Sequence, residues 1–328
     1  MQFIRPALLA TTILTASMTA AFADVKVVTS IKPVHSLVAA VMQGVGTPDL
    51  IVEGAGSPHT YALKPSQAKQ LQEADLVFWM SHDLEAFLEK SIDGIATKAV
   101  SVPLMESRGL MTLGFREGGA FDDHGHDEHD DHDEHDKDDD HDHEKHDDHD
   151  EHDHGEVDPH VWLDPENAKA MVHEIEEALA KADPANAATY ESNAEAVMAK
   201  LDSLVAEIDS ELQPVKGRGY IVFHDAYQYF ENRFGVSAIG SITVSPEVLP
   251  GAERISDLQE KVRSLDATCV FSEPQFEPKL VATVTENTNA RTGVLDPLGA
   301  AIDKGPNLYF TLIRNMASSL KNCLLGSG

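Results

Sequence analysis

The sequence has few cysteines, few aromatic residues and little positive charge. Its 328 residues include two cysteines, 6% aromatic residues, and 25 lysines and arginines against 56 aspartates and glutamates, so the formal net charge is −31. This acidic balance argues against nucleic acid or anionic lipid as a partner. Beyond residue 23 no apolar run is long enough to span a bilayer, so we expect no direct insertion into a membrane.

The N-terminal segment and the two cysteines point to the same compartment. Residues 1–23 contain an apolar stretch that ends in the small-x-small sequence Ala21-Phe22-Ala23, which is typical of a cleaved secretory signal peptide. Cys269 and Cys323 lack the close spacing of a zinc motif. In an oxidising compartment a lone pair of cysteines most simply forms one disulfide. We therefore expect an exported protein that begins at Asp24 and contains a Cys269–Cys323 disulfide.

Residues 122–154 form a low-complexity run of 11 histidines, 19 acidic residues, two lysines and one glycine. Such a segment is too polar to bury a core, so we expect a mobile, disordered loop. A solvating acidic spacer is one interpretation, but acid alone would achieve solubility. Because imidazole binds ions such as zinc, copper and nickel, the abundance of histidine favours weak metal collection. The histidines concerned are His124, His126, His129, His132, His135, His141, His143, His146, His149, His152 and His154.

Elsewhere, short apolar segments alternate with longer amphipathic ones, which predicts parallel sheets covered by helices. We expect two α/β lobes, an N-terminal one over 24–183 and a C-terminal one over 214–328, joined by one long rigid helix at 184–213. The predicted strands are 25–30, 49–52, 76–80, 99–102, 220–223, 237–243, 269–271 and 293–295.

Polar residues suited to metal binding follow several of these strands. His59, His224 and Asp296 come after predicted strands, and His160 lies just beyond the histidine-rich run. Ligands of open parallel sheets bind at the carboxyl ends of strands, so a cleft between the lobes could gather all four. Each histidine alone is more often an ordinary surface or hydrogen-bonding residue. Together, three imidazoles and one carboxylate suit tetrahedral zinc.

Six short motifs, spread in order over nearly the whole mature chain, make a family resemblance specific. They are Ser30-Ile-Lys-Pro-Val-His35-Ser-Leu37, Pro58-His59-Thr-Tyr61, Asp158-Pro-His160-Val-Trp-Leu-Asp164, Phe223-His224-Asp-Ala-Tyr227, Glu273-Pro-Gln-Phe276 and Leu295-Asp296-Pro-Leu-Gly299. With them the sequence resembles the zinc-binding, ZnuA-type solute-binding proteins of bacterial ABC importers, the metal-binding group also called cluster A-I. A histidine-rich loop ahead of the second histidine motif is itself typical of zinc-binding members.

The resemblance implies a periplasmic monomer that captures Zn²⁺ as cargo and delivers it to a membrane ABC permease. It also implies His59, His160 and His224 as zinc ligands, with Asp296 as fourth ligand or close neighbour. Some zinc-binding members have an acidic residue where this chain has Pro58, which leaves Asp296 or a water to complete the coordination. Four further residues are candidates for orienting the ligand side chains through hydrogen bonds without touching the metal: His35, Asp158, Asp225 and Glu273.

Three other functions fit the sequence less well than zinc import does. A manganese-binding homologue usually has glutamate where this chain has His224, and oxygen ligands suit manganese better. A secreted zinc hydrolase is disfavoured because the sequence contains no HExxH helix, no G-x-S-x-G motif and no cysteine nucleophile beside a histidine. A metal buffer that uses only the histidine-rich run leaves the ordered ligand motifs unexplained. We therefore expect a binding protein and not an enzyme.

Overall fold

The computed structural model describes residues 25–116, 121, 157–243, 251–264 and 269–326. The predicted signal peptide and the histidine-rich run both lie outside the described residues. The first sheet is parallel, with strand order β2-β1-β3-β4. Its strands are β1 (Val27–Thr29), β2 (Asp49–Leu50), β3 (Leu76–Trp79) and β4 (Val100–Pro103).

The second sheet repeats this topology further along the chain. Its strand order is β6-β5-β7-β8, and again every pair is parallel. The strands are β5 (Tyr220–His224), β6 (Ala238–Thr243), β7 (Cys269–Ser272) and β8 (Arg291–Val294). Both faces of β5 are buried in different apolar clusters, as expected for a parallel sheet with helices on both sides. The predicted fold of two parallel α/β sheets is confirmed.

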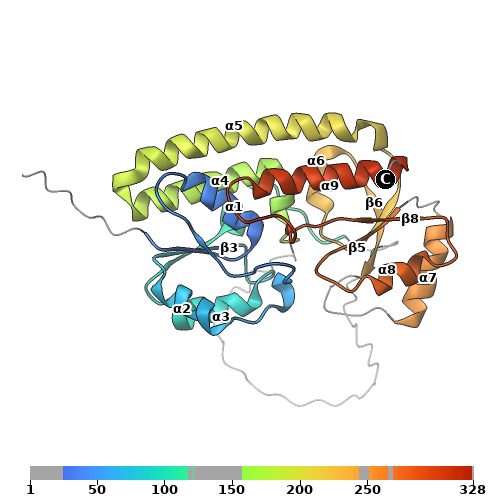
Figure 1. Ribbon diagram of the computed structural model, residues 1–328, viewed down its shortest axis with the longest axis horizontal. Coiled ribbons are helices and arrows are strands. Elements are labelled where there is room, and N and C mark those ends of the chain that lie inside the picture. Colours follow the sequence, from blue (N-terminus) through green and yellow to red (C-terminus); the bar gives the residue numbers. More distant parts are fainter. Residues whose placement is uncertain (1–24, 117–120, 122–156, 244–250, 265–268, 327–328) are drawn as a thin grey trace, which may run out of the picture.

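Helices cover the two sheets and also connect them (Figure 1). The α-helices are α1 (Lys32–Val41), α2 (Pro65–Glu73), α3 (Ala86–Ile95), α4 (Pro165–Ala182), α5 (Ala187–Leu212), α6 (Gln228–Phe234), α7 (Ala252–Ser264), α8 (Lys279–Thr285) and α9 (Leu308–Leu325). Short 3-10 turns are η1 (Pro58–Thr60), η2 (Leu104–Glu106), η3 (Val161–Leu163), η4 (Pro184–Asn186) and η5 (Gln213–Val215). None of the helices in the described part of the chain has the length and apolar character that a membrane span needs.

The long helix α5 lies across both halves of the molecule (Figure 1). It has 26 residues, which corresponds to about 39 Å at 1.5 Å per residue. The buried face of α5 includes Tyr190, Val197 and Leu204, which recur at the helical spacing visible in the sequence. Helix α9, the last helix of the described chain, packs against α5 and against the first helix, α1. One apolar core therefore contains residues of both sheets, including Phe78 and Phe271.

The two cysteines link the second sheet to the C-terminal helix. Cys269 in β7 is disulfide-bonded to Cys323 in α9, which confirms the predicted pairing. Beside this bond, Arg291 of β8 donates from Nε to the Cys323 carbonyl at 2.7 Å. Arg218 donates to the Leu324 carbonyl at 2.9 Å. The last turn of α9, whose carbonyls have no helical partner, is thereby fixed to the sheet.

Candidate metal centre

Three histidines from separate parts of the chain meet between the two sheets. His59 lies in η1, where Pro58 occupies the first turn. His160 directly precedes η3, and His224 is the last residue of β5. His160 and His224 are each only 4% exposed. The structure thus brings together three of the four residues that the sequence suggests as ligands, and their role in metal binding stays a prediction.

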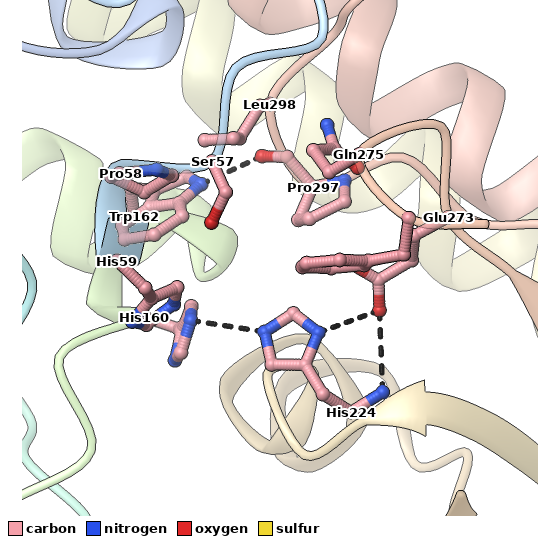
Figure 2. Close-up of a pocket in the computed structure, with 11 residues that line it drawn as sticks. Ser57, Pro58, His59, His160, Trp162, His224, Glu273, Gln275, Pro297 and Leu298 are labelled. Carbon is pink, nitrogen blue, oxygen red and sulfur yellow. Dashed lines mark hydrogen bonds and ion pairs between the residues drawn. The ribbon is translucent and has the colours of Figure 1, made fainter. Parts of the chain in front are cut away.

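The nitrogens of these histidines are spaced as metal ligands. One ligand atom from each of the three lies within 4.8 Å of the others. The Nε2 atoms of His160 and His224 are 3.4 Å apart. Two imidazole nitrogens on a tetrahedral zinc ion, each at about 2.0–2.1 Å, would be about 3.3–3.4 Å apart. The pair is thus already at the separation that one ion requires (Figure 2).

Buried carboxylates fix the orientation of two of the rings. Asp158 Oδ1 lies 2.6 Å from His160 Nδ1 and also accepts the backbone N–H of His160 at 2.9 Å. Glu273 Oε1 lies 2.7 Å from His224 Nδ1. A carboxylate can only accept from the ring, so Nδ1 carries the proton in each histidine. The Nε2 lone pairs are therefore directed into the site.

Most of the remaining pocket wall is apolar, although Ser57 and Gln275 also line it. The Trp162 ring centroid is 5.1 Å from that of His160, and the Phe276 ring meets His224 edge-on at 5.8 Å. Trp162 Nε1 donates to the Pro297 carbonyl at 2.9 Å, which joins the segment after His160 to the loop after β8. Such walls exclude water and strengthen electrostatic interactions inside the pocket.

Burial and charge act in opposite directions on two of the histidines. Burial first, and then the neighbouring imidazoles of His160 and His224, lower the pKa of His59 to about 2. His59 is therefore neutral near pH 7 and able to bind a metal. Burial also opposes the charged form of His224, but Glu273, with Asp225 and Asp158 beyond it, raises the pKa of His224 overall. A proton on His224 therefore competes with the metal, so binding weakens as the pH falls.

Asp296, the expected fourth ligand or close neighbour, does not join the three histidines among the described residues. Its carboxylate instead binds the loop that follows it. Oδ1 accepts the backbone N–H groups of Leu298 and Gly299 at 3.1 and 2.9 Å. Oδ2 accepts that of Ala300 at 2.6 Å, and the Gln275 amide adds a bond of 3.0 Å to Oδ1. Coordination by Asp296 stays a prediction, and it would compete with these bonds.

Two of the candidate orienting residues lie elsewhere. His35 is buried in α1, with Nε2 3.2 Å from the Pro48 carbonyl, and burial lowers the pKa of His35 to about 4. Asp225 follows His224, but its carboxylate pairs with the Arg116 guanidinium. In contrast to Asp158 and Glu273, these two residues form their hydrogen bonds away from the site imidazoles.

Helix α6 contributes to the site in a way that the sequence does not predict. Gln228 Nε2 donates to Asp158 Oδ2 at 2.6 Å, and the Tyr229 hydroxyl donates to the Asp158 carbonyl at 2.7 Å. Both residues closely follow the Phe223-His224-Asp-Ala-Tyr227 motif. Their nearness to His224 in the chain was the available signal, but the helix has only seven residues, so Phe230 and Phe234 gave too short a periodic pattern to mark it.

The parallel sheets, the long helix across them and the histidine pocket between them define a two-lobed, metal-binding solute-binding protein. The chain belongs to the ZnuA family, zinc-uptake complex component A, periplasmic, whose model matches residues 27–323. The resemblance inferred from the six motifs is confirmed.

Named relatives and a solved structure agree with this family. The high-affinity zinc uptake system protein ZnuA of Brucella abortus (strain 2308) is 58% identical over 304 residues, which cover 91% of each chain. The protein of the same name from Yersinia pestis is 36% identical over 324 residues, or 98% of each chain. A crystal structure of ZnuA matches with a TM-score of 0.70 and 23% identity, covering 91% of this chain and 100% of that one. At this identity the structural likeness supports the fold alone.

Proposed function

We propose that this protein is a periplasmic zinc-binding protein that captures Zn²⁺ and delivers it to the membrane permease of an ABC importer. His59, His160 and His224 supply the ligands. The observation that carries the proposal is the convergence of these three imidazoles, with ligand atoms within 4.8 Å of one another. Family membership and the zinc-uptake relatives support zinc as the cargo.

The chemistry of the ligands favours zinc over manganese, because imidazole nitrogen suits zinc and oxygen ligands suit manganese. Asp296 already accepts three backbone N–H groups, which favours water in the fourth position. Catalysis would need a free general base beside such a water. The two carboxylates that touch the site imidazoles, Asp158 and Glu273, each accept a ring N–H. Binding and transfer of the ion fit this arrangement better than hydrolysis.

Alanine substitution at each histidine tests the site. His59→Ala, His160→Ala and His224→Ala each remove a ligand, so zinc affinity should fall by more than the roughly 10–100-fold that loss of an outer hydrogen bond costs. Affinity is measured by competition with a chromophoric chelator, in protein that lacks residues 122–154 so that weak sites do not obscure the result.

His173→Ala is the matched control, because His173 is exposed on α4 and pairs with Glu176 and Glu177, away from the site. This variant should bind zinc as the parent does. If all three site variants also bound zinc like the parent, the tight site would lie elsewhere and the proposal would fail.

A further inference from the structure

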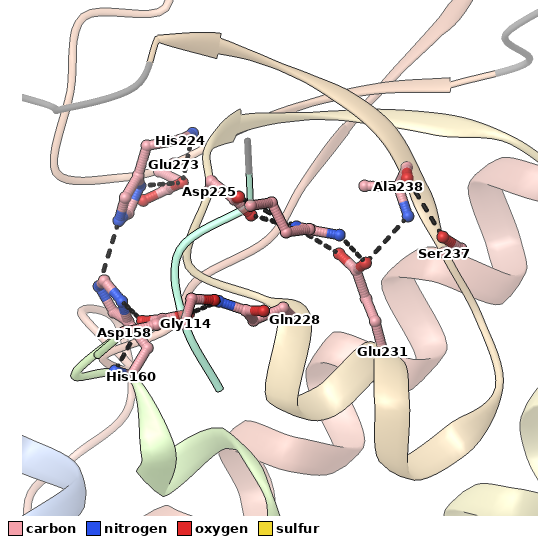
Figure 3. A network of polar contacts seen from close by, with 11 residues as sticks. Gly114, Asp158, His160, His224, Asp225, Gln228, Glu231, Ser237, Ala238 and Glu273 are labelled. Atoms are coloured by element: carbon pink, nitrogen blue, oxygen red, sulfur yellow. Dashed lines mark hydrogen bonds and ion pairs between the residues drawn. The ribbon is translucent and has the colours of Figure 1, made fainter. Parts of the chain in front are cut away.

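Helix α6 belongs to the second half of the chain but reaches the segment that carries His160. Gln228, at its start, donates from Nε2 to Asp158 Oδ2 at 2.6 Å and to the Gly114 carbonyl at 3.0 Å. Asp158 is fully buried, and its other oxygen, Oδ1, holds His160 at Nδ1 and at the backbone nitrogen. Hydrogen bonds thus run from α6 through a carboxylate to a site imidazole (Figure 3).

The next residue of α6 fixes the backbone of the same segment. The Tyr229 hydroxyl donates to the Asp158 carbonyl at 2.7 Å and accepts the Leu113 N–H at 2.9 Å. The Asp158 N–H donates to the Leu113 carbonyl at 2.9 Å, and Gly114 pairs with Val157 in an antiparallel bridge. The stretch before His160 is therefore bonded both to a neighbouring strand-like segment and to α6.

The helix is itself anchored next to the other buried histidine. It begins directly after the turn Asp225-Ala226-Tyr227 that follows His224. Arg116 binds Asp225 at the start of this stretch and Glu231, through Nη1 at 2.6 Å, one turn into the helix. The 224–231 stretch thus carries one ligand and fixes the position of another.

We propose that Gln228 is a positioning residue for metal binding. It holds the Asp158 carboxylate so that His160 presents Nε2 to His224 at the spacing of one ion. The inference rests on the proposed function, because it concerns the same site. Without the Gln228 amide, Asp158 Oδ2 loses the donor bonded to it inside the protein, and the Asp158–His160 pair is free to reorient.

Gln228→Met tests this, because methionine keeps the length of the side chain but cannot donate. In the full-length chain, zinc affinity measured by chelator competition should fall roughly 10-fold. The visible ligand-field spectrum of bound Co²⁺ should change, since it reports ligand geometry at the metal and not the stability of the fold. Gln213→Met is the matched control, because Gln213 is exposed and donates to Asp209. It should leave both affinity and spectrum unchanged.

A double-mutant cycle with His160→Ala separates positioning from a general structural effect. If Gln228 acts through His160, Gln228→Met costs no further affinity once His160 is absent. Gln228→Asn, which withdraws the amide by one methylene, should shift affinity in the same direction and serves if the methionine variant does not fold.

Unchanged affinity and Co²⁺ spectrum in the Gln228 variants would overturn the inference, and so would an equal loss in the His160→Ala background. In either case, a loss of zinc affinity in the single variant His160→Ala would still support the proposed site. Parent-like binding by His160→Ala would instead overturn the site, and the inference with it.

Discussion

The carboxyl group of Glu85, at the N-cap of α3 just beyond the first sheet, is fully buried. Its Oε2 accepts the backbone N–H groups of Met80 and Ser81 at 2.8 and 3.2 Å. Burial raises the pKa of Glu85 to about 7, although these N–H groups and the Ser30 hydroxyl act to lower it. The folded protein therefore binds this proton more tightly than the unfolded chain does.

The sign of the resulting pH dependence follows from the direction of this shift. The favourable contribution of protonated Glu85 is fully present below the ordinary glutamate pKa and is lost as the pH rises to about 7. Glu85→Gln keeps an acceptor and removes the charge. As the pH rises from about 5 to about 8, the parent should lose about 3 kcal/mol of unfolding free energy relative to the Glu85→Gln variant.

Urea unfolding at both pH values measures this difference. Glu195→Gln, at an exposed position of α5, is the control and should show no comparable trend. A difference between Glu85→Gln and the parent that stays constant with pH would contradict the argument.

The elements that sequence patterns predicted are those with strong apolar periodicity. All eight predicted strands and the long helix α5 overlap the observed elements. The buried residues of β3 and α5 are wholly apolar, whereas β8 is an exception because none of its residues is buried. Helix α6 was missed because its buried face includes Gln228 and Glu231 as well as Phe230. Their polar partners, Asp158 and Arg116, lie far away in sequence, and one chain cannot reveal such pairings.

Turn chemistry explains why the site was only partly predictable. The three histidines stood out because they follow strands or flank the histidine-rich run. Asp296 looked equally suitable, yet its carboxylate turns back onto Leu298, Gly299 and Ala300. Aspartate before a Pro-x-Gly sequence often bonds backbone N–H groups a few residues on. That local signal competes with the metal-ligand pattern, and the three backbone hydrogen bonds of Asp296 satisfy it.

The disulfide is the covalent contact between β7 and α9, and it closes a loop with a sequence separation of 54 residues. Restricting the unfolded chain in this way is worth about 4 kcal/mol on the chain-entropy model. Chemical denaturation with and without reductant should therefore show a less stable reduced protein. Cys269 and Cys323 do not line the histidine pocket, so zinc affinity should be unchanged. Two free thiols in protein purified from periplasm would contradict the disulfide assignment.

Across the whole molecule, buried polar contacts hold the two halves together at the pocket. Lys32 of α1 is 6% exposed and donates from Nζ to the carbonyls of Gly299 and Ile302, each at 2.6 Å. The Tyr309 hydroxyl of α9 donates to the Trp162 carbonyl at 2.7 Å. The loop after β8 is thus fixed through its N–H groups by Asp296 and through its carbonyls by Lys32. This arrangement favours a pocket whose walls are in place before the metal arrives.

The same division between a preformed pocket and a polar run predicts two kinds of zinc binding. The 11 histidines of residues 122–154 lie outside the described residues, and their composition predicts weak sites at which each ion must order the chain. Ordinary imidazole has a pKa of about 6.5 and only its neutral form binds metal, while nearby carboxylates favour the charged form. Weak binding should therefore fade as the pH falls towards about 6.

Deleting residues 122–154 should lower the zinc stoichiometry and leave one tight ion. Gly114 and Val157, on either side of the run, already pair with each other, so a shortened connection can preserve the position of His160. The tight site should keep its zinc at lower pH than the run does, because burial keeps His59 neutral. The raised pKa of His224 limits how far the pH can fall before this site also loses the ion. Calorimetry on both forms at two pH values measures stoichiometry and affinity together. Loss of the tight ion on deletion would mean that the run belongs to the primary site. The run and the three-histidine pocket would then not be separate binding sites.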